Sequence, residues 1–364
     1  MLSRRTYLQA SAAVCAAPLL GGPMRLFGND RTLFVPDVSA VAKDLVQESM
    51  VVDMLGLITL DYKKLVSWQS IPQSFHEADF KRLKDSGVTV LHPGVGFVTG
   101  DVYNSSLQDL TRWNTFLTAY PQWFTKVLEP RDLALAKASG KIGIILGLQN
   151  SQHFRSLADV DAFYKLGQRI SQLTYFNNKL GGGSTDPQCG LSAFGGDVVK
   201  RMNQLGMAID LSHCSDHTTL DAIAQSTKPV LITHSNCRAL VPGNTRCKTD
   251  EAIRKLAANG GVLGVTMVRP FVRAGGPVTL EDVLKHIDHV ASLVGVEHVG
   301  LGTDVDLDGR EHGAPRSSDL DGVQYPRKVL SLVEGLLRRR YSSADVQRII
   351  GGNVVRTLTA SWAA

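Results

Sequence analysis

Two short segments constrain this chain more than any other feature, because each is an apolar run that ends in a histidine. The segment 209–215 reads IDLSHCS and contains His213, and the segment 231–236 reads LITHSN and contains His234. In a (β/α)8 barrel the C-terminal ends of the strands converge on one mouth, so two such histidines can share one ion. Their 21-residue spacing leaves room for one helix, over 216–225, before the next strand. Either histidine alone could be a hydrogen-bonded residue at a strand end, but equivalent positions in neighbouring βα units favour shared chemistry.

Short apolar runs alternate with helical stretches along the rest of the chain, which is typical of parallel βα units. The predicted strands are 50–55, 88–92, 142–148, 170–175, 207–211, 230–233, 261–265 and 298–302. The predicted helices include 158–168, 194–205, 250–258 and 280–294, with closing helices at 325–340 and 343–357. Eight strands is the barrel number. We therefore expect an α/β fold, a single TIM barrel over residues 31–364 with C-terminal helices, and a glycine-rich loop at 181–190 that borders the pocket.

The net charge bears on the possible partners of the chain, and its first residues bear on its location. The net charge of +5 is mild and its Lys and Arg residues are scattered, so no nucleic-acid partner is expected. Residues 3–9, SRRTYLQ, followed by a small apolar run to residue 20, resemble a twin-arginine export signal. An Arg pair before an Ala-rich helix is the alternative. We expect residues 1–30 to be a signal peptide and leader, recognised by the twin-arginine machinery, and the protein to be periplasmic or exported.

The cysteines outside this leader do not predict a metal site. Cys189, Cys214, Cys237 and Cys247 lack the close paired spacing of a zinc–thiolate centre. Cys214 and Cys237 lie near the two histidines, yet a residue directly after a strand-end ligand usually points away from it. We expect packing or a disulfide, which an oxidising compartment would permit.

A carboxylate closes the last predicted strand. The segment 300–306 reads GLGTDVD, and its small residues allow a tight turn that delivers Asp304 to the mouth. A carboxylate beside two imidazoles can complete a metal site or act as general base on water. Capping the following helix is the alternative role.

Several motifs together resemble the membrane (renal-type) dipeptidases, peptidase family M19. They are GLSAFG at 190–195, LGMAIDLSH at 205–213, ITHSN at 232–236, TDE at 249–251 and VGLGTD at 299–304. The resemblance implies an amidohydrolase-like (β/α)8 barrel that cleaves dipeptides with two zinc ions bridged by water. It implies that His213 and His234 bind one of these ions, that Asp304 is the acid/base aspartate, and that Arg246 holds the substrate carboxylate.

The chain departs from the family pattern at the other ligands. The His-x-Asp pair after the first strand falls on Leu55 and Leu57, and a leucine cannot bind zinc. The bridging glutamate falls on Gln149, a neutral amide that offers one oxygen. The substrate-facing histidine falls on Tyr175, whose hydroxyl can donate a hydrogen bond to an oxyanion. We therefore expect the first zinc position to be lost and one zinc ion to be held by His213, His234 and Gln149, with Asp304 as the alternative third ligand.

His92 and an aromatic group at 62–68 each have two interpretations, and three other histidines are expected outside the site. His92, before Pro93, is either a replacement ligand or a turn histidine. His153, His217 and His312 are expected to face solvent. The group at 62–68, YKKLVSW, either lines the pocket or packs as a surface loop.

The leading hypothesis is a metal-dependent hydrolase of a dipeptide or small amide, with Asp304 and Tyr175 as catalytic residues and Arg246 and Asn177 as substrate contacts. One alternative is a dipeptidase-like barrel that serves as a binding or maturation protein, which Leu55 and Leu57 favour by making the mouth drier. Another is a lyase or isomerase that uses Asp304 and Tyr175 as acid and base. A homodimer is an open alternative to a monomer.

Overall fold

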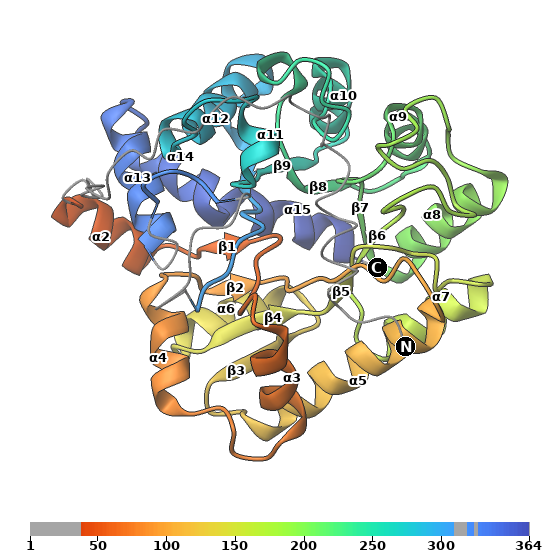
Figure 1. Cartoon of the computed structure of the whole chain (residues 1–364), viewed down its shortest axis with the longest axis horizontal. Helices are drawn as coiled ribbons and strands as arrows, with labels where there is room; N and C mark the ends of the chain where they lie inside the picture. Colours follow the sequence, from red (N-terminus) through yellow and green to blue (C-terminus); the bar gives the residue numbers. More distant parts are fainter. Residues whose placement is uncertain (1–37, 309–318, 324–326, 364) are drawn as a thin grey trace, which may run out of the picture. The chain divides into compact units, whose positions relative to one another are not determined.

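The computed structural model describes residues 38–308, 319–323 and 327–363 (Figure 1). Its strands form one parallel sheet in the order β3-β4-β2-β1-β10-β9-β8-β7-β6-β5. They are β1 (Val52–Asp53), β2 (Val90–Leu91), β3 (Phe124–Val127), β4 (Ile142–Ile145), β5 (Gly147–Leu148), β6 (Ile170–Gln172), β7 (Ala208–Asp210), β8 (Leu231–Ser235), β9 (Val262–Val265) and β10 (Val299–Leu301). Every predicted strand overlaps one or two of these, although β8 extends two residues beyond the predicted 230–233, and β3 is the strand that the sequence pattern missed.

The sheet closes on itself because β4 and β5 are two parts of one chain segment, separated only by Leu146. β4 pairs with β2, whereas β5 pairs with β6, and β1 pairs with β10. The ring therefore runs from β1 through β2, β4 with β5, and β6 to β10. β3 pairs with β4 and lies outside the ring. The α/β TIM-barrel fold predicted from the sequence is confirmed.

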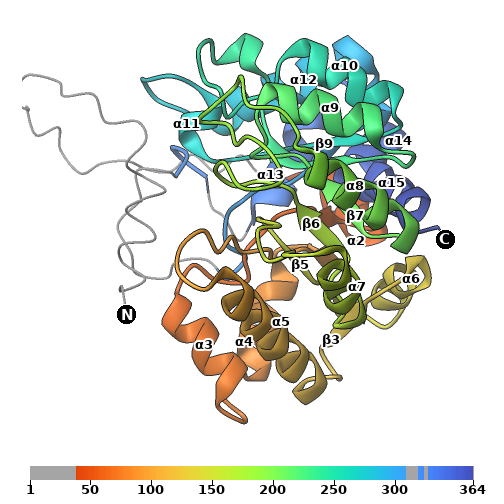
Figure 2. The same ribbon diagram turned by 90° about the vertical axis from the view of Figure 1, so that its right-hand side faces the viewer.

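Helices surround the strands (Figures 1 and 2). They are α2 (Ala40–Glu48), α3 (Tyr62–Ser70), α4 (Glu77–Asp85), α5 (Val102–Ala119), α6 (Pro130–Ala138), α7 (Leu157–Lys165), α8 (Ala193–Leu205), α9 (Asp216–Gln225), α10 (Asp250–Ala258), α11 (Arg269–Val272), α12 (Leu280–Val294), α13 (Lys328–Arg338), α14 (Ser343–Gln347) and α15 (Asn353–Trp362), with short turns η2 (Arg238–Leu240), η3 (Val296–His298) and η5 (Arg348–Gly352). Side-chain caps set where the helices near the site begin: Ser215 accepts from the N–H of Thr218 at α9, and Thr249 accepts from that of Ala252 at α10.

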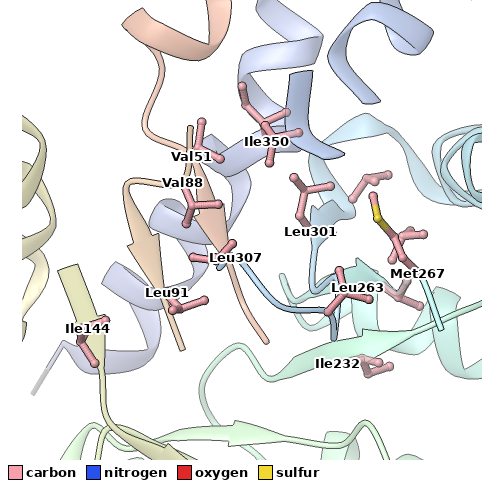
Figure 3. Close-up of a cluster of buried hydrophobic side chains, with 14 of the residues drawn as sticks. Val51, Val88, Leu91, Ile144, Ile232, Leu263, Met267, Leu301, Leu307 and Ile350 are labelled. Carbon is pink, nitrogen blue, oxygen red and sulfur yellow. The ribbon is translucent and has the colours of Figure 1, made fainter. Parts of the chain in front are cut away.

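In several strands, neighbouring residues point to opposite faces and belong to two different hydrophobic clusters. One cluster contains one residue from each of several strands, together with three residues of α15: Val52, Val90, Ile145, Ile170, Ala208, Leu231, Val262, Val354, Leu358 and Trp362. Helix α15 therefore packs against the strands through this layer. The neighbouring strand residues belong to the cluster in Figure 3, which includes Val51, Ile144, Ile232, Leu263 and Leu301. This alternation is the period-two pattern of strands covered on both faces.

Two local expectations are wrong. For residues 62–68 the surface-loop alternative is wrong, because residues 62–70 form helix α3, in which Trp68 is buried against Phe75 with ring centroids 5.0 Å apart. His153 is fully buried rather than facing solvent. Both of its ring nitrogens have partners there, at 2.9 Å from the Asn150 carbonyl and 3.1 Å from Gln168 Oε1. His217 is exposed as expected. His312 and the leader at 1–30 lie outside the described residues.

The cysteines and the helices settle two further points within the described residues. Cys189, Cys214, Cys237 and Cys247 are free thiols, and the last three are buried, so packing rather than a disulfide holds them here. No helix in the described part of the chain combines the length and the apolar character that crossing a membrane requires.

Candidate active site

The two histidines singled out by the sequence meet at one end of the barrel. His213 follows β7 and His234 lies within β8, and their Nε2 atoms are 3.0 Å apart. The ring of Tyr175, which follows β6, stacks on that of His213 with centroids 4.0 Å apart and an interplanar angle of 24°. Three consecutive strands of the ring therefore bring three side chains to one place.

A buried polar network fixes the orientation of His234. The Thr233 hydroxyl donates to Asp210 Oδ2 over 2.7 Å, and the Ser212 hydroxyl donates to Asp210 Oδ1 over 2.6 Å. Because the single Thr233 proton is used on the carboxylate, Thr233 Oγ1 accepts at 2.8 Å from Nδ1–H of His234. This tautomer leaves a lone pair on His234 Nε2, the atom that faces His213. A carboxylate acting through a hydroxyl is the kind of outer partner that orients a metal-binding imidazole.

Both imidazoles are held neutral. Burial is the main cause, and the positive charge of Arg246 adds to it, so the pKa of His213 and that of His234 lie well below the usual range. A neutral imidazole can accept a cation on its free nitrogen, whereas an imidazolium cannot. The two Nε2 atoms, which face each other, can therefore act together as ligands for one cation.

Arg246 donates hydrogen bonds to the backbone beside both histidines. Its Nη1–H donates to the Ser212 carbonyl and its Nη2–H to the His234 carbonyl, both over 2.8 Å. These two bonds tie the turn after β7 to strand β8. Nε of Arg246 is buried and has no protein acceptor among the described residues. Two of the five N–H groups of the guanidinium thus bond to the backbone and hold the turn after β7 against β8, and the group also contributes positive charge.

Asp304 follows β10, at the same end of the parallel barrel as the two histidines. Burial and the nearby Asp53 raise the pKa of its carboxyl to about 7, although Arg246 and Lys328 act in the opposite direction. A carboxyl with this pKa exchanges a proton near neutral pH, which is what a general acid or base requires. Its backbone has φ 57°, and its N–H donates to the Leu55 carbonyl over 2.7 Å.

The other predicted site residues are engaged within the protein. Gln149 Nε2 donates to the Gly94 carbonyl over 2.8 Å. Asn177 Nδ2 donates to Asp186 Oδ2 over 2.8 Å, and its Oδ1 accepts from the N–H of Gly183, so this amide shapes the glycine-rich loop. Gln149 retains its amide oxygen for other partners, whereas both ends of Asn177 are occupied.

His92 lies in the barrel interior near the site. Nδ1–H donates to the Met54 carbonyl over 2.8 Å, which leaves Nε2 as a buried acceptor without a partner in the described part of the chain. Glycines at 94 and 147 make room for the ring, since a Cβ at either position would lie 2.7 Å or 2.3 Å from Nε2. The contacts favour a ring enclosed by the strands over a turn histidine facing solvent.

Sequence reasoning missed the network that surrounds the histidines. Asp210 ends β7, Ser212 follows it and Thr233 lies at the middle of β8, and all three are fully buried. The available signal was their polarity within otherwise apolar strands, because buried polar groups need specific partners. The buried Lys328 gave no local signal, since it precedes an ordinary amphipathic helix pattern.

Residues 39–362 match the family described as membrane dipeptidase, peptidase family M19. The chain belongs to the M19 family. It is 33% identical over 268 residues to the dipeptidase tcpJ of Claviceps purpurea, covering 71% of this chain and 61% of that protein. It is 37% identical over 226 residues to the dipeptidase verJ of Clonostachys rogersoniana, covering 60% of this chain and 55% of that protein. The matched region thus spans less than two thirds of the length of these relatives.

A solved structure has the same fold as this protein over most of both chains. The crystal structure of an amidohydrolase from Pseudomonas aeruginosa superposes with a TM-score of 0.74 and 27% identity, covering 88% of this chain and 99% of that one. Together with the family match, this agreement confirms the amidohydrolase-like barrel predicted from the sequence.

Among the described residues, the two imidazole nitrogens of His213 and His234 are a pair of donor atoms that could hold a cation. Leu55 is fully buried and Leu57 partly so, and neither offers a donor atom. Among the residues that the structure describes, no three His, Cys, Asp or Glu side chains are grouped to hold a metal ion. Within the described residues, Asp304 is thus not grouped with the two histidines in a three-residue cluster. What fits is one cation on two imidazole nitrogens, with its other positions left to water, an amide oxygen or substrate.

Proposed function

We propose that this protein hydrolyses the amide bond of a dipeptide or similar small amide, with one divalent cation, zinc in the first instance, bound by His213 and His234. The observation that carries the proposal is the approach of two neutral imidazole nitrogens to 3.0 Å at the end of the barrel that also bears Asp304. The dipeptidase relatives and the M19 family match support the reaction class. When bound there, a divalent cation supplies Lewis acidity toward a carbonyl oxygen.

The side chains divide the work of such a reaction. Asp304, with a pKa of about 7, takes a proton from the attacking water and returns it to the leaving amine. Tyr175 is held by stacking on His213 and offers a hydroxyl toward a developing oxyanion. Arg246 places positive charge beside both groups, which favours binding of a substrate carboxylate nearby. Gln149 offers an amide oxygen as a further cation ligand.

Metal analysis and a dipeptide panel test the proposal together. We expect up to one equivalent of divalent metal in the purified protein, loss of that metal in His213→Ala, and turnover of at least one dipeptide. Asp304→Asn should keep the metal and lose turnover by roughly 10²-fold or more, because a positioned base contributes 10²–10⁴-fold. A folded protein that binds no zinc, cobalt or manganese and cleaves nothing would overturn the proposal.

A second function is favoured by one observation. Leu55 has no exposed surface and Leu57 is partly buried, so hydrocarbon stands where the family resemblance places two zinc ligands. A drier mouth of this kind suits a binding or maturation protein, or a lyase or isomerase that uses Asp304 and Tyr175. Normal folding without metal or turnover, combined with retention of a small molecule by the purified protein, would support this second function.

The support for export comes from the leader sequence alone. We propose that SRRTYLQ at residues 3–9 directs the chain through the twin-arginine machinery to the periplasm. Replacing Arg4 and Arg5 with Lys should leave the protein in the cytoplasmic fraction, and unchanged export of this variant would contradict the proposal.

A further inference from the structure

The buried lysine at the start of α13 contacts the segment that carries Asp304. Lys328 has no exposed surface, which is rare for lysine unless its charge is paired. Its Nζ donates to Thr303 Oγ1 over 2.7 Å and to the Val305 carbonyl over 3.1 Å. Asp53 Oδ2 lies 3.5 Å away and balances the charge. One ammonium therefore contacts the residue before Asp304 and the residue after it.

The segment between these two contacts has a conformation that needs support. Asp304 adopts φ 57°, a left-handed conformation that a residue with a side chain keeps only where its surroundings fix it. Asp53 accepts from the N–H of Thr303 over 2.8 Å and from its hydroxyl. The Leu55 carbonyl accepts from the N–H of Asp304. Without Lys328, the Val305 side of the turn would lose its only side-chain donor among the described contacts.

We propose that Lys328 is a positioning residue for Asp304, whose ammonium holds Thr303 and Val305 and so fixes the direction in which the carboxyl between them points. The role as stated rests on the proposed function, because it assumes that Asp304 moves the proton. The residue touches neither substrate nor cation in this scheme. It acts through the backbone and through its charge.

The charges facing Asp304 give this role a signature that packing alone would not produce. Arg246 and Lys328 lower the pKa of the Asp304 carboxyl, whereas Asp53 raises it. Asp306 faces Lys328 as well, with one oxygen that lacks a partner among the described residues. Removing the Lys328 charge should therefore raise the pKa of Asp304, and removing the Asp53 charge should lower it.

The test compares Lys328→Met, Asp53→Asn and the double variant with the parent protein. The rise of kcat/KM with pH should move to higher pH in Lys328→Met and to lower pH in Asp53→Asn, each by about one pH unit or less. On the alkaline plateau, where Asp304 is ionised in every variant, kcat of Lys328→Met should still fall about tenfold while KM changes little, because the base is misdirected. NMR of carbon-labelled aspartate, assigned with Asp304→Asn, should show the same opposite displacements without substrate.

The matched control is Lys248→Met. Lys248 is as deeply buried, and its ammonium donates to the Cys214 carbonyl and to Thr219 Oγ1, outside the Asp304 segment. This variant loses a buried ammonium as well, but the titration of Asp304 should stay where it is. Circular dichroism and thermal unfolding establish that each variant is folded.

Each outcome decides one question. An unmoved Asp304 titration in Lys328→Met, or displacement in the same direction in both single variants, overturns the positioning role. If Lys328→Met does not fold, the double variant decides: a kcat equal to that of Asp53→Asn overturns the role, and a lower one supports it. If no dipeptide is cleaved but the NMR displacements are opposite, the proposed function fails while the effect of Lys328 on Asp304 stands.

Discussion

At the scale of single residues, Thr233 determines which nitrogen of His234 is free. Its hydroxyl accepts from Nδ1–H of His234 and donates to Asp210. Thr233→Val keeps the shape but removes both bonds, so the imidazole can turn or change tautomer. We expect zinc affinity to fall by about 10–100-fold, measured by competition with a chelating dye.

The control for this change is Thr266→Val. Thr266 is also fully buried, near the end of β9, and its hydroxyl donates to the Thr303 carbonyl over 3.3 Å rather than to a histidine. Zinc affinity should remain within about twofold of the parent value, inside the usual context scatter of such outer contacts. Equal losses in the two valine variants would show that a general packing defect, rather than the His234 tautomer, sets the affinity.

Asp304 links function to pH-dependent stability. Burial raises the pKa of its carboxyl from the usual 3.8 to about 7, so the folded protein keeps a proton that the unfolded chain releases. The folded state then binds more protons between these values, and the free energy of unfolding falls as pH rises through them. Asp304→Asn removes this dependence. It should be more stable than the parent at about pH 8 by on the order of 2 kcal/mol, since the carboxyl is partly exposed and solvent screens part of the cost.

Urea unfolding at about pH 5 and about pH 8 measures this difference. The gain of Asp304→Asn should shrink toward zero at the lower pH. Asp197→Asn is the control, because that carboxylate lies on the surface of α8 with its side chain 57% exposed. A gain of equal size at both pH values would mean that burial of the charge is not the cause.

At the scale of elements, strands β8, β9 and β10 approach each other around the Thr233 carbonyl. A Cβ at Gly302 would lie 1.6 Å from this oxygen, and one at Gly264 would lie 2.0 Å from it. Gly302→Ala must therefore move the segment after β10, which includes Asp304, away from β8, which carries His234. We expect a loss of about 3 kcal/mol in the free energy of unfolding, together with loss of activity in whatever protein remains folded, measured by urea unfolding and dipeptide assay.

Gly352→Ala provides the comparison. This glycine lies in the helical turn η5 with φ −54°, and a Cβ there would meet no atom closer than 3.3 Å. Its stability should change by less than about 1 kcal/mol, in the range expected for alanine replacing glycine in a helix. If Gly302→Ala were equally mild, the close approach of the two strands would not constrain the site.

The elements that the sequence predicted are those whose pattern is local. Buried parallel strands read as apolar runs, and helices α9, α10 and α12 match their predicted bounds, with Ser215 and Thr249 as caps where α9 and α10 begin. β3 reads FTKV and has two half-buried residues at its centre, so it lacks a continuous apolar run. Helix α3 begins at a capping Asp61, but its hydrophobic face is short and the segment resembles a loop.

At the scale of the whole molecule, the sequence predicted that His213 and His234 lie together but not which residues support them. Barrel topology sends neighbouring strand ends to one mouth, so His213 and His234 could be paired from their spacing alone. The bonds from Asp53 to Thr303 span 250 residues, and those from Lys328 join the last part of the chain to β10. No local pattern encodes such contacts, because they depend on how the ring of strands closes. The use of Arg246 on two backbone carbonyls was hidden for the same reason.

Binding of a cation at one point of the ring should stabilise the entire barrel. The two imidazoles come from the β7 turn and from β8, so a shared ion ties these units together in the folded state only. At a free zinc concentration about 100 times Kd, linkage predicts a gain of about 2.7 kcal/mol in the free energy of unfolding. Scanning calorimetry of metal-stripped protein should show Tm rising by a few degrees with added zinc and falling again when a chelator is added. His213→Ala and His234→Ala should each abolish the rise, because one imidazole is a weak ligand. A rise that survives in both variants would place the ion elsewhere, and no rise in the parent would mean that the two rings share a proton instead of a metal.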